Sequence, residues 1–72
     1  MDNALQSQLQ KIPNEPGIYQ YYDKDDKLLY VGKAKNLKKR VKSYFTKECS
    51  PNPKNSLRIQ HMVAQIAHIH TI

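Results

Sequence analysis

Four of the five tyrosines in this chain lie within residues 17–33, on both sides of a short charged segment. The stretch reads GIYQYYDKDDKLLYVGK, and a basic block follows directly behind it. Phenols beside cations are able to orient a water molecule and to stabilise negative charge on a reacting group. The same rings also suit cross-strand packing in a half-buried sheet. The residue types alone leave the chemical and the packing interpretations open.

The basic block contains seven lysines and arginines and no acidic residue, in a chain whose net charge is +6. Such a block favours a polyanionic partner, either nucleic acid or an anionic membrane surface. A solvated helix face that only aids solubility is the alternative. The cationic residues of the block are Lys33, Lys35, Lys38, Lys39, Arg40, Lys42 and Lys47.

The elements that position these residues follow from the hydrophobic pattern. Residues 17–22 and 27–32 are aromatic and β-branched runs around an Asp-rich turn, which predicts an antiparallel hairpin. Alternation places Tyr19 and Tyr21 on one face of the first strand, and Gln20 and Tyr22 on the other. The chain's two glycines, Gly17 and Gly32, bracket the hairpin, where glycine permits close backbone approach.

Three helices and a further strand are predicted around the hairpin. A short amphipathic helix spans residues 5–12 behind an Asp2 or Asn3 cap, and Pro13 ends it. A basic helix spans residues 36–45 with Asn36 as N-cap, lysines on one face and an apolar face of Leu37, Val41, Tyr44 and Phe45. Residues 49–55 read as a loop, and residues 56–69 as a third helix with the apolar stripe Ile59, Met62, Val63, Ile66 and Ala67. The terminal HIHTI opens another strand.

This order predicts an α+β fold in which a small antiparallel sheet, the hairpin plus a third strand, is flanked by helices. We expect one domain over residues 1–72, with a thin core because the chain is short. The strand that stops at Ile72 suggests that the domain is C-terminally incomplete. No stable homo-oligomer is expected.

Location and cysteine chemistry are constrained as well. No apolar run approaches a bilayer span and no signal peptide opens the chain, so we expect a cytoplasmic protein without a membrane partner. The single cysteine, Cys49, excludes an internal disulfide and lies in a predicted loop without a histidine base. His61, His68 and His70 form a poor zinc set, because only the last two share a strand face.

Two triplets resemble a known family. GIY at residues 17–19 and YVG at residues 30–32 are separated by ten residues, which is similar to the GIY-YIG nuclease superfamily with valine for isoleucine. The lead-in IPNEPGIY and the segment YVGKAKNLKKRVKSYF resemble the excision-repair branch of that superfamily, the N-terminal domain of the UvrC excinucleases. The resemblance covers essentially the whole chain.

The resemblance implies a GIY-YIG-like fold and a metal-dependent endonuclease that hydrolyses one DNA strand on the 3′ side of a lesion, in nucleotide excision repair and the SOS response. It implies Mg²⁺ or Mn²⁺ as cofactor, and DNA and the damage-recognition protein UvrB as partners. It places the catalytic roles on Tyr19, Tyr30, Lys33, Arg40 and Tyr44, with Gly17, Gly32 and Asn36 as structural positions. DNA-backbone contacts would come from Lys35, Lys38, Lys39 and Lys42.

These roles agree with the chemistry, apart from the metal. A phenol can hold or deprotonate a water, and the planar fork of Arg40 suits a phosphate better than a lysine does. The family also holds its cation with a glutamate, but this chain has no acidic residue after Glu48. We therefore expect that the metal-binding glutamate lies beyond Ile72 and that these residues bind DNA without efficient cutting.

Two other functions stay open, and a third is disfavoured. The missing glutamate and the basic helix would also suit a DNA-binding module without chemistry. A structure-specific GIY-YIG nuclease outside excision repair would carry the same triplets. A membrane-surface module is disfavoured, because the apolar face of the basic helix has the spacing of a core-facing helix.

Overall fold

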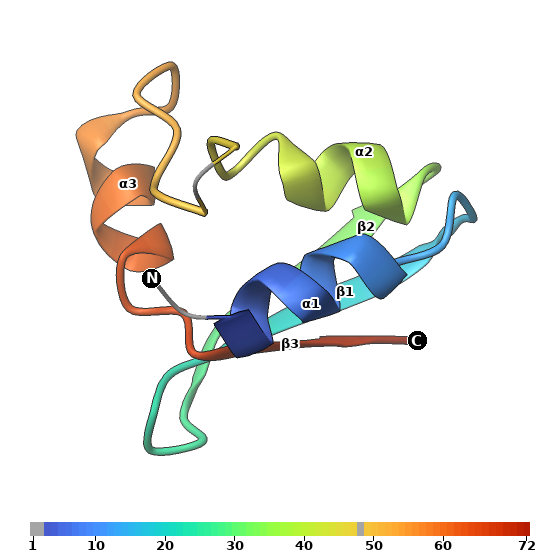
Figure 1. The fold of residues 1–72 in the computed structure, drawn as a ribbon, viewed down its shortest axis with the longest axis horizontal. Helices are drawn as coiled ribbons and strands as arrows, with labels where there is room; N and C mark the ends of the chain where they lie inside the picture. Colours follow the sequence, from blue (N-terminus) through green and yellow to red (C-terminus); the bar gives the residue numbers. More distant parts are fainter. Residues whose placement is uncertain (1–2, 48) are drawn as a thin grey trace.

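The computed structural model describes residues 3–47 and 49–72, and it confirms the predicted α+β fold (Figure 1). The elements follow one another in the expected order of helix, hairpin, two helices and a last strand. No helix in the described part of the chain is long and apolar enough to cross a membrane. The elements are α1 (Asn3–Lys11), β1 (Gly17–Tyr22), β2 (Leu28–Ala34), α2 (Leu37–Lys42), α3 (Leu57–Val63) and β3 (His68–Thr71).

The sheet has the order β2-β1-β3, and both pairings are antiparallel. The last strand therefore joins the hairpin, as predicted, and makes β1 the central strand. In this register Tyr19 lies opposite Gly32 on β2 and opposite Thr71 on β3, while Tyr21 lies opposite Tyr30 and Ile69. Cross-strand partners share a face, so one face of the sheet collects the tyrosines Tyr19, Tyr21 and Tyr30.

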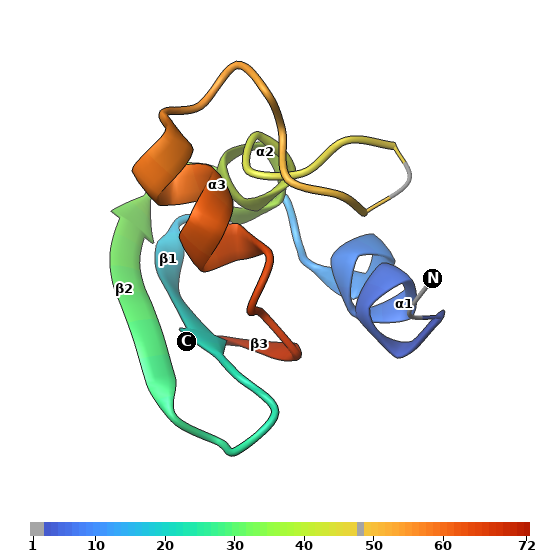
Figure 2. The same cartoon turned by 90° about the vertical axis from the view of Figure 1, so that its left-hand side faces the viewer.

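The core lies between that face and the helices, and Figure 2 shows the helices gathered on one side of the sheet. Tyr19 and Tyr21 are among the largest fully buried side chains, at 1% and 0% exposure. They pack in one cluster with apolar side chains from all three helices, among them Leu9, Val41 and Val63. The packing interpretation of the tyrosines therefore holds for Tyr21 and, in part, for Tyr19.

The two later helices are shorter than predicted. The basic helix ends at Lys42 instead of residue 45, because Tyr44 and Phe45 make turn-type hydrogen bonds to the carbonyls three residues before them. The Phe45 backbone then pairs with Pro51 in an isolated bridge. Tyr44 and Phe45 still reach the core, so their burial was predicted correctly and their helical conformation was not.

The third helix ends at Val63, although the apolar stripe continues through Ile66 and Ala67. The Ala67 N–H donates to the carbonyl of Tyr22 at 2.7 Å, which draws the chain toward the sheet. Sheet formation outweighs the helical pattern here. At the other end of the chain, Asp2 and the side chain of Asn3 lie outside the described residues, so the predicted α1 cap is untested.

Candidate active site

The hydroxyl groups of Tyr19 and Tyr44 lie 2.9 Å apart and form a buried hydrogen bond. Arg40 joins both phenols, because its Nε donates to the Tyr19 hydroxyl and its terminal NH₂ donates to the Tyr44 hydroxyl, each at 3.4 Å. The guanidinium carbon also lies 5.3 Å from the centre of the Tyr44 ring, within cation–π range. The structure thus brings these three predicted site residues into direct contact.

Glycine allows Tyr19 to reach this position. A Cβ atom on Gly32 would overlap the ring and hydroxyl of Tyr19, which lies opposite it on the neighbouring strand. A Cβ atom on Gly17 would similarly meet the carbonyl oxygen of Ile72 and the side chain of Leu37. Both glycines are therefore needed for close approach, with no unusual backbone angle involved.

The start of α2 places Arg40. The side chain of Asn36 accepts a hydrogen bond from the Lys39 N–H at 3.0 Å, which confirms it as the N-cap. The proline-rich lead-in supplies further acceptors, since the carbonyl of Glu15 receives the Leu37 N–H and the carbonyl of Pro13 receives the Lys38 N–H. These contacts fix the helix against the strand that carries Tyr19.

Tyr30 completes the phenol group at the surface. Its ring centre lies 6.2 Å from that of Tyr19 and 6.3 Å from that of Tyr44. Its exposure is 37%, against 1% for Tyr19 and 4% for Tyr44. Tyr30 is therefore the phenol of this group that is exposed to solvent, whereas the other two are buried beside Arg40.

Lys33 occupies a different face from the tyrosines. It pairs with Ile18 in the sheet register, one residue out of step with Tyr19 and Gly32. It nevertheless lines a shallow hollow of about 440 Å³ together with Arg40. The other cations of this hollow are Lys35 and Lys39. Lys33 therefore lies beside Arg40 in this basic hollow and on the other face of the sheet from the tyrosines.

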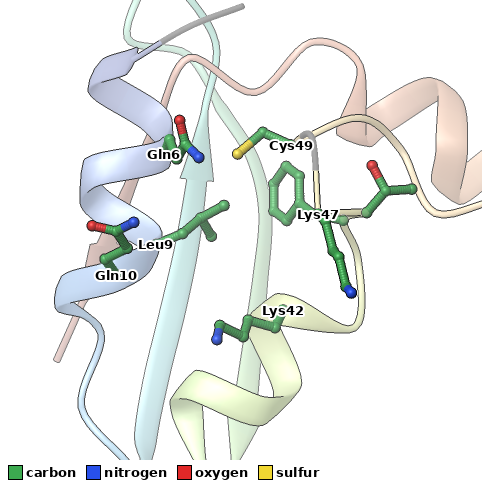
Figure 3. Close-up of a pocket in the computed structure, with 8 residues that line it drawn as sticks. Gln6, Leu9, Gln10, Lys42, Lys47 and Cys49 are labelled. Atoms are coloured by element: carbon green, nitrogen blue, oxygen red, sulfur yellow. The ribbon is translucent and has the colours of Figure 1, made fainter.

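Only two of the four lysines predicted to contact DNA line the basic hollow. Lys35 and Lys39 line the basic hollow beside Arg40. Lys38 instead donates from Nζ to the carbonyl of Gln10 on α1 at 3.5 Å, and Lys42 lines a separate pocket between α1 and residues 45–49 (Figure 3). The basic hollow therefore includes two of these four lysines, and a DNA contact by Lys38 or Lys42 would lie outside it.

Burial raises the pKa of two phenols, those of Tyr44 and Tyr21. It raises the pKa of Tyr44 well above its ordinary value, the hydrogen bond with Tyr19 adds to the shift, and the charge of Arg40 opposes it. Burial likewise raises the pKa of Tyr21, and the neighbouring phenols add to this. The hydrogen bond to Tyr19 raises the pKa of Arg40, which stays charged. At neutral pH Tyr44 is therefore a neutral hydrogen-bonding group and not a base.

Sequence reasoning gave Tyr21 no role beyond the inner face of the strand. Its ring centre lies 5.2 Å from those of both Tyr19 and Tyr44, so it packs against both members of the hydrogen-bonded pair. Its hydroxyl is fully buried and finds no hydrogen-bond partner among the described residues. The strand alternation predicted that Tyr21 shares a face with Tyr19, but nothing in the sequence indicated an unpaired hydroxyl.

The residues of the site do not fit a divalent cation by themselves. Their oxygens are phenolic, and Arg40 and the neighbouring lysines are cationic, whereas Mg²⁺ requires oxygen ligands that usually include a carboxylate. The side chain of Asp23 is engaged in the hairpin turn, where it accepts the N–H groups of Asp25 and Lys27. Within residues 3–47 and 49–72, no three His, Cys, Asp or Glu side chains gather into a metal site.

The histidines are placed by the sheet and by α3. His68 stacks on Tyr22, with ring centres 4.9 Å apart, and its Nε2 lies 3.6 Å from a carboxylate oxygen of Asp26. His70 follows on the same strand, and His61 is exposed on α3. His68 therefore has structural neighbours at the turn end of the hairpin.

Known proteins resemble this chain in sequence. A family model described as the UvrC-like GIY-YIG domain matches residues 15–72. A UvrABC system protein C from Helicobacter pylori is 59% identical over 71 residues, and one from Campylobacter jejuni is 54% identical over 70 residues. Each match covers 94% of this chain, which spans only 12% of the length of those relatives.

A solved structure resembles the whole chain. It is the crystal structure of the GIY-YIG N-terminal endonuclease domain of UvrC from Thermotoga maritima, bound to its catalytic divalent cation, magnesium. The TM-score is 0.77 and the sequence identity 28%, and the match covers 100% of this chain and 72% of that one. The arrangement of sheet and helices described above is therefore shared with that domain.

Proposed function

The chain belongs to the UvrC-like GIY-YIG domain family, and we propose that its residues form the phosphate-binding and water-positioning part of an endonuclease site that cuts one strand of DNA. The observation that carries the proposal is the anchoring of Arg40 on the buried Tyr19–Tyr44 pair, at the edge of the basic hollow.

Arg40 is the residue proposed to bind the scissile phosphate. Two of its nitrogens are already committed to phenol oxygens, which restrains the guanidinium before substrate arrives. A preorganised cation of this kind stabilises the charge that develops on the phosphate oxygens without reorganising during the reaction. Tyr19 and Tyr44 are then positioning residues, because they act on the phosphate through Arg40.

Tyr30 is the phenol proposed to contact the attacking water. It is the exposed member of the group, and its ring is held beside those of Tyr19 and Tyr44. A hydroxyl in this place can orient a water toward a phosphate on Arg40, which supplies the proximity that hydrolysis requires. Tyr30→Phe should therefore lower the cutting rate while DNA affinity stays the same.

The basic hollow is proposed as the path of the DNA backbone. Lys33, Lys35 and Lys39 line it together with Arg40, with no acidic side chain among the residues that form it. Lysines bind phosphates as point charges and read no base sequence. Affinity from this surface should be independent of sequence and should fall steeply with salt.

A first experiment tests the DNA path with two matched double variants. Lys35→Ala with Lys39→Ala removes two cations from the hollow, and Lys38→Ala with Lys42→Ala removes the same charge from outside it. Fluorescence anisotropy with duplex DNA is measured across a salt series. The first pair should reduce the salt slope by about one unit per lysine, and the second should leave it unchanged. Equal losses would remove the hollow as the DNA path.

The metal ion and the biological reaction involve groups other than the described residues. We propose that a divalent cation, Mg²⁺ or Mn²⁺, is held with a carboxylate that the described residues do not supply. The relatives are named UvrABC system protein C, which supports a place in excision repair with the damage-recognition protein UvrB as partner. We propose further that the incision lies on the 3′ side of a lesion. A DNA-binding module without chemistry is the second candidate, and the lack of a carboxylate in the site favours it.

A nicking assay separates these two functions. The 72-residue chain is compared with a chimera in which it is followed by the residues that come after the matched segment in the Helicobacter pylori relative. In Mn²⁺ or Mg²⁺ the chimera should nick supercoiled plasmid, and Arg40→Lys in the chimera should slow nicking by about a hundredfold. The chain alone should bind DNA without nicking it.

Other results of the assay would have clear meanings. Robust metal-dependent nicking by the 72 residues alone would show that the site needs no further carboxylate. A folded chimera that binds DNA but does not nick would favour the module without chemistry. Unchanged nicking by the Arg40→Lys chimera would show that the planar fork is unnecessary, which would contradict the role proposed for Arg40.

A further inference from the structure

Two asparagine side chains converge on the backbone just after the end of α2. The Nδ2 atoms of Asn52 and Asn55 both donate to the carbonyl of Ser43, at 3.1 Å and 3.4 Å. The backbone N–H of Asn52 donates to the next carbonyl, that of Tyr44, at 3.0 Å. The segment that leads into α3 therefore holds two successive carbonyls, and the second belongs to a residue of the candidate active site. We call Asn52 and Asn55 the asparagine clamp.

Water alone would satisfy the Ser43 carbonyl, because both of the side-chain bonds that it accepts are exposed to solvent. A free carbonyl at a helix end needs no protein donor when water reaches it. Two side chains nevertheless meet on this carbonyl, and together with the backbone bond to Tyr44 they restrict the directions that the two peptide groups can take. The asparagine clamp therefore restrains the path of the chain and does not compensate for a buried polar group.

The asparagine clamp is itself held in place by local hydrogen bonds. The side chain of Asn52 accepts the Lys54 N–H at 3.0 Å, and the Asn55 N–H donates to the Asn52 carbonyl at 3.1 Å, which closes a tight turn. From α3, Nε2 of Gln60 donates to the carbonyl of Asn55 at 2.8 Å. The two asparagines are therefore fixed to α3 before they contact the end of α2.

The position of Tyr44 depends on these contacts, because Tyr44 lies beyond the helix. α2 ends at Lys42, and the Tyr44 N–H makes only a turn-type bond to the carbonyl of Val41. The Tyr44 hydroxyl lies 2.9 Å from that of Tyr19 and accepts a hydrogen bond from Arg40 at 3.4 Å. Hydrogen bonds weaken steeply when their length or angle changes. A displacement of the backbone at residues 43 and 44 would therefore be transmitted through the Tyr44 ring to the guanidinium.

We propose that Asn52 and Asn55 are positioning residues of the candidate active site. They fix the backbone at residues 43 and 44, and through Tyr44 they fix the guanidinium of Arg40. The effect on DNA cutting rests on the function proposed above for Arg40, whereas the effect on the guanidinium does not. The site is thereby built from the turn before α3 as well as from the hairpin and α2.

The first measurement is NMR spectroscopy of the 72-residue chain. The chain has only two arginines, so the Nε–H signal of Arg40 is assigned by its loss in Arg40→Lys. Asn52→Asp with Asn55→Ala removes both side-chain donors and keeps an acceptor for the Lys54 N–H. In this double variant the Arg40 Nε–H should exchange with water about fivefold faster or more, because its hydrogen bond to Tyr19 opens more often.

A matched control makes the same two kinds of substitution elsewhere in the chain. Asn14→Asp with Gln65→Ala changes two exposed amides and should leave the Arg40 exchange rate as it is. Asn55→Ala alone keeps the turn bonds of Asn52, so it guards against a double variant that does not fold, and it should accelerate the exchange to a smaller extent. Exchange of the backbone N–H groups of β1, the central strand, reports the overall stability of every variant.

The second measurement places the same double variant in the chimera used for the nicking assay. A small misplacement of a preorganised group lowers the rate of the chemical step, so kcat should fall about tenfold or more. The KM for DNA should stay within about twofold of that of the control pair, since the cations of the basic hollow are unchanged. Loss of rate without loss of affinity is the signature of a positioning role.

An unchanged Arg40 exchange rate in a folded double variant would overturn the proposal. Equal acceleration of Arg40 and of the β1 backbone would overturn it as well, because it would reveal a role in overall stability alone. Faster Arg40 exchange with unchanged nicking is resolved by the Arg40→Lys chimera. Slow nicking by that chimera would overturn the catalytic part of the proposal. Unchanged nicking would instead contradict the phosphate-binding role of Arg40 and support the positioning of its guanidinium by the asparagine clamp.

Discussion

The hydroxyl of Tyr19, on the central strand, lies 2.9 Å from the hydroxyl of Tyr44. Tyr44 comes just after the end of α2 and is twenty-five residues from Tyr19 in the sequence. The bond is buried and is shared with Arg40, so three side chains act as one unit. Several measurable consequences depend on this unit and on the residues that surround it.

Tyr19→Phe and Tyr44→Phe should not be additive. Each removes one end of the same hydrogen bond and leaves the other hydroxyl with Arg40 alone, so each should lower the free energy of unfolding by about 1 kcal/mol. The double variant should lose less than the sum of the two, with a coupling of about 0.5 kcal/mol or more. Urea denaturation of all four proteins completes the cycle, and strict additivity would show that the bond contributes nothing in solution.

Gly32→Ala should destabilise the chain because its methyl group overlaps the ring of Tyr19. Forcing a methyl into a packed core costs about 1–3 kcal/mol and here also displaces the hydroxyl from Tyr44. Thermal denaturation in a Tyr19→Leu background supplies the control, since the shorter side chain makes room for the methyl. A Gly32→Ala loss of the same size in both backgrounds would argue against this contact as its cause.

Stability should fall at alkaline pH. The raised pKa of Tyr44 means that the folded chain keeps a proton that the unfolded chain releases near pH 10, the ordinary phenol range. The unfolded state then binds fewer protons, so the free energy of unfolding decreases as the pH rises above about 10. Urea denaturation across this range should show a shallower decrease in the free energy of unfolding for Tyr44→Phe, because this variant lacks the phenol with the raised pKa. Lysine titration affects both proteins equally and cancels in the comparison. Identical slopes would contradict the raised pKa.

Tyr21→Phe should leave the chain as stable as before or make it more stable by up to about 1 kcal/mol. The ring that packs against Tyr19 and Tyr44 is kept, and a buried hydroxyl without a partner among the described residues is removed. Chemical denaturation is the measurement, with Tyr19→Phe as the contrasting variant that loses a hydrogen bond. A clear loss of stability in Tyr21→Phe would reveal a partner for this hydroxyl, such as a bound water.

Local patterns predicted the hairpin, the Asn36 cap and the order of elements, since strand alternation, turn residues and capping chemistry act between near neighbours. They failed at the ends of α2 and α3. There, contacts with distant residues competed with the helical pattern: Asn52 donates its N–H to the carbonyl of Tyr44, and Ala67 donates to Tyr22. Such contacts have no signal in a local window of sequence.

By itself, the sequence determined the family of this chain and the residue types of its site, because the two triplets and the spacing between them can be recognised without a structure. The tertiary structure alone decided which phenols are buried and which is exposed, since burial depends on what packs above a strand. It also separated Lys35 and Lys39 from Lys38 and Lys42. The packing of α2 against α1 and against the end of β2 determines which of these lysines line the hollow, and this packing cannot be read from the spacing of basic residues.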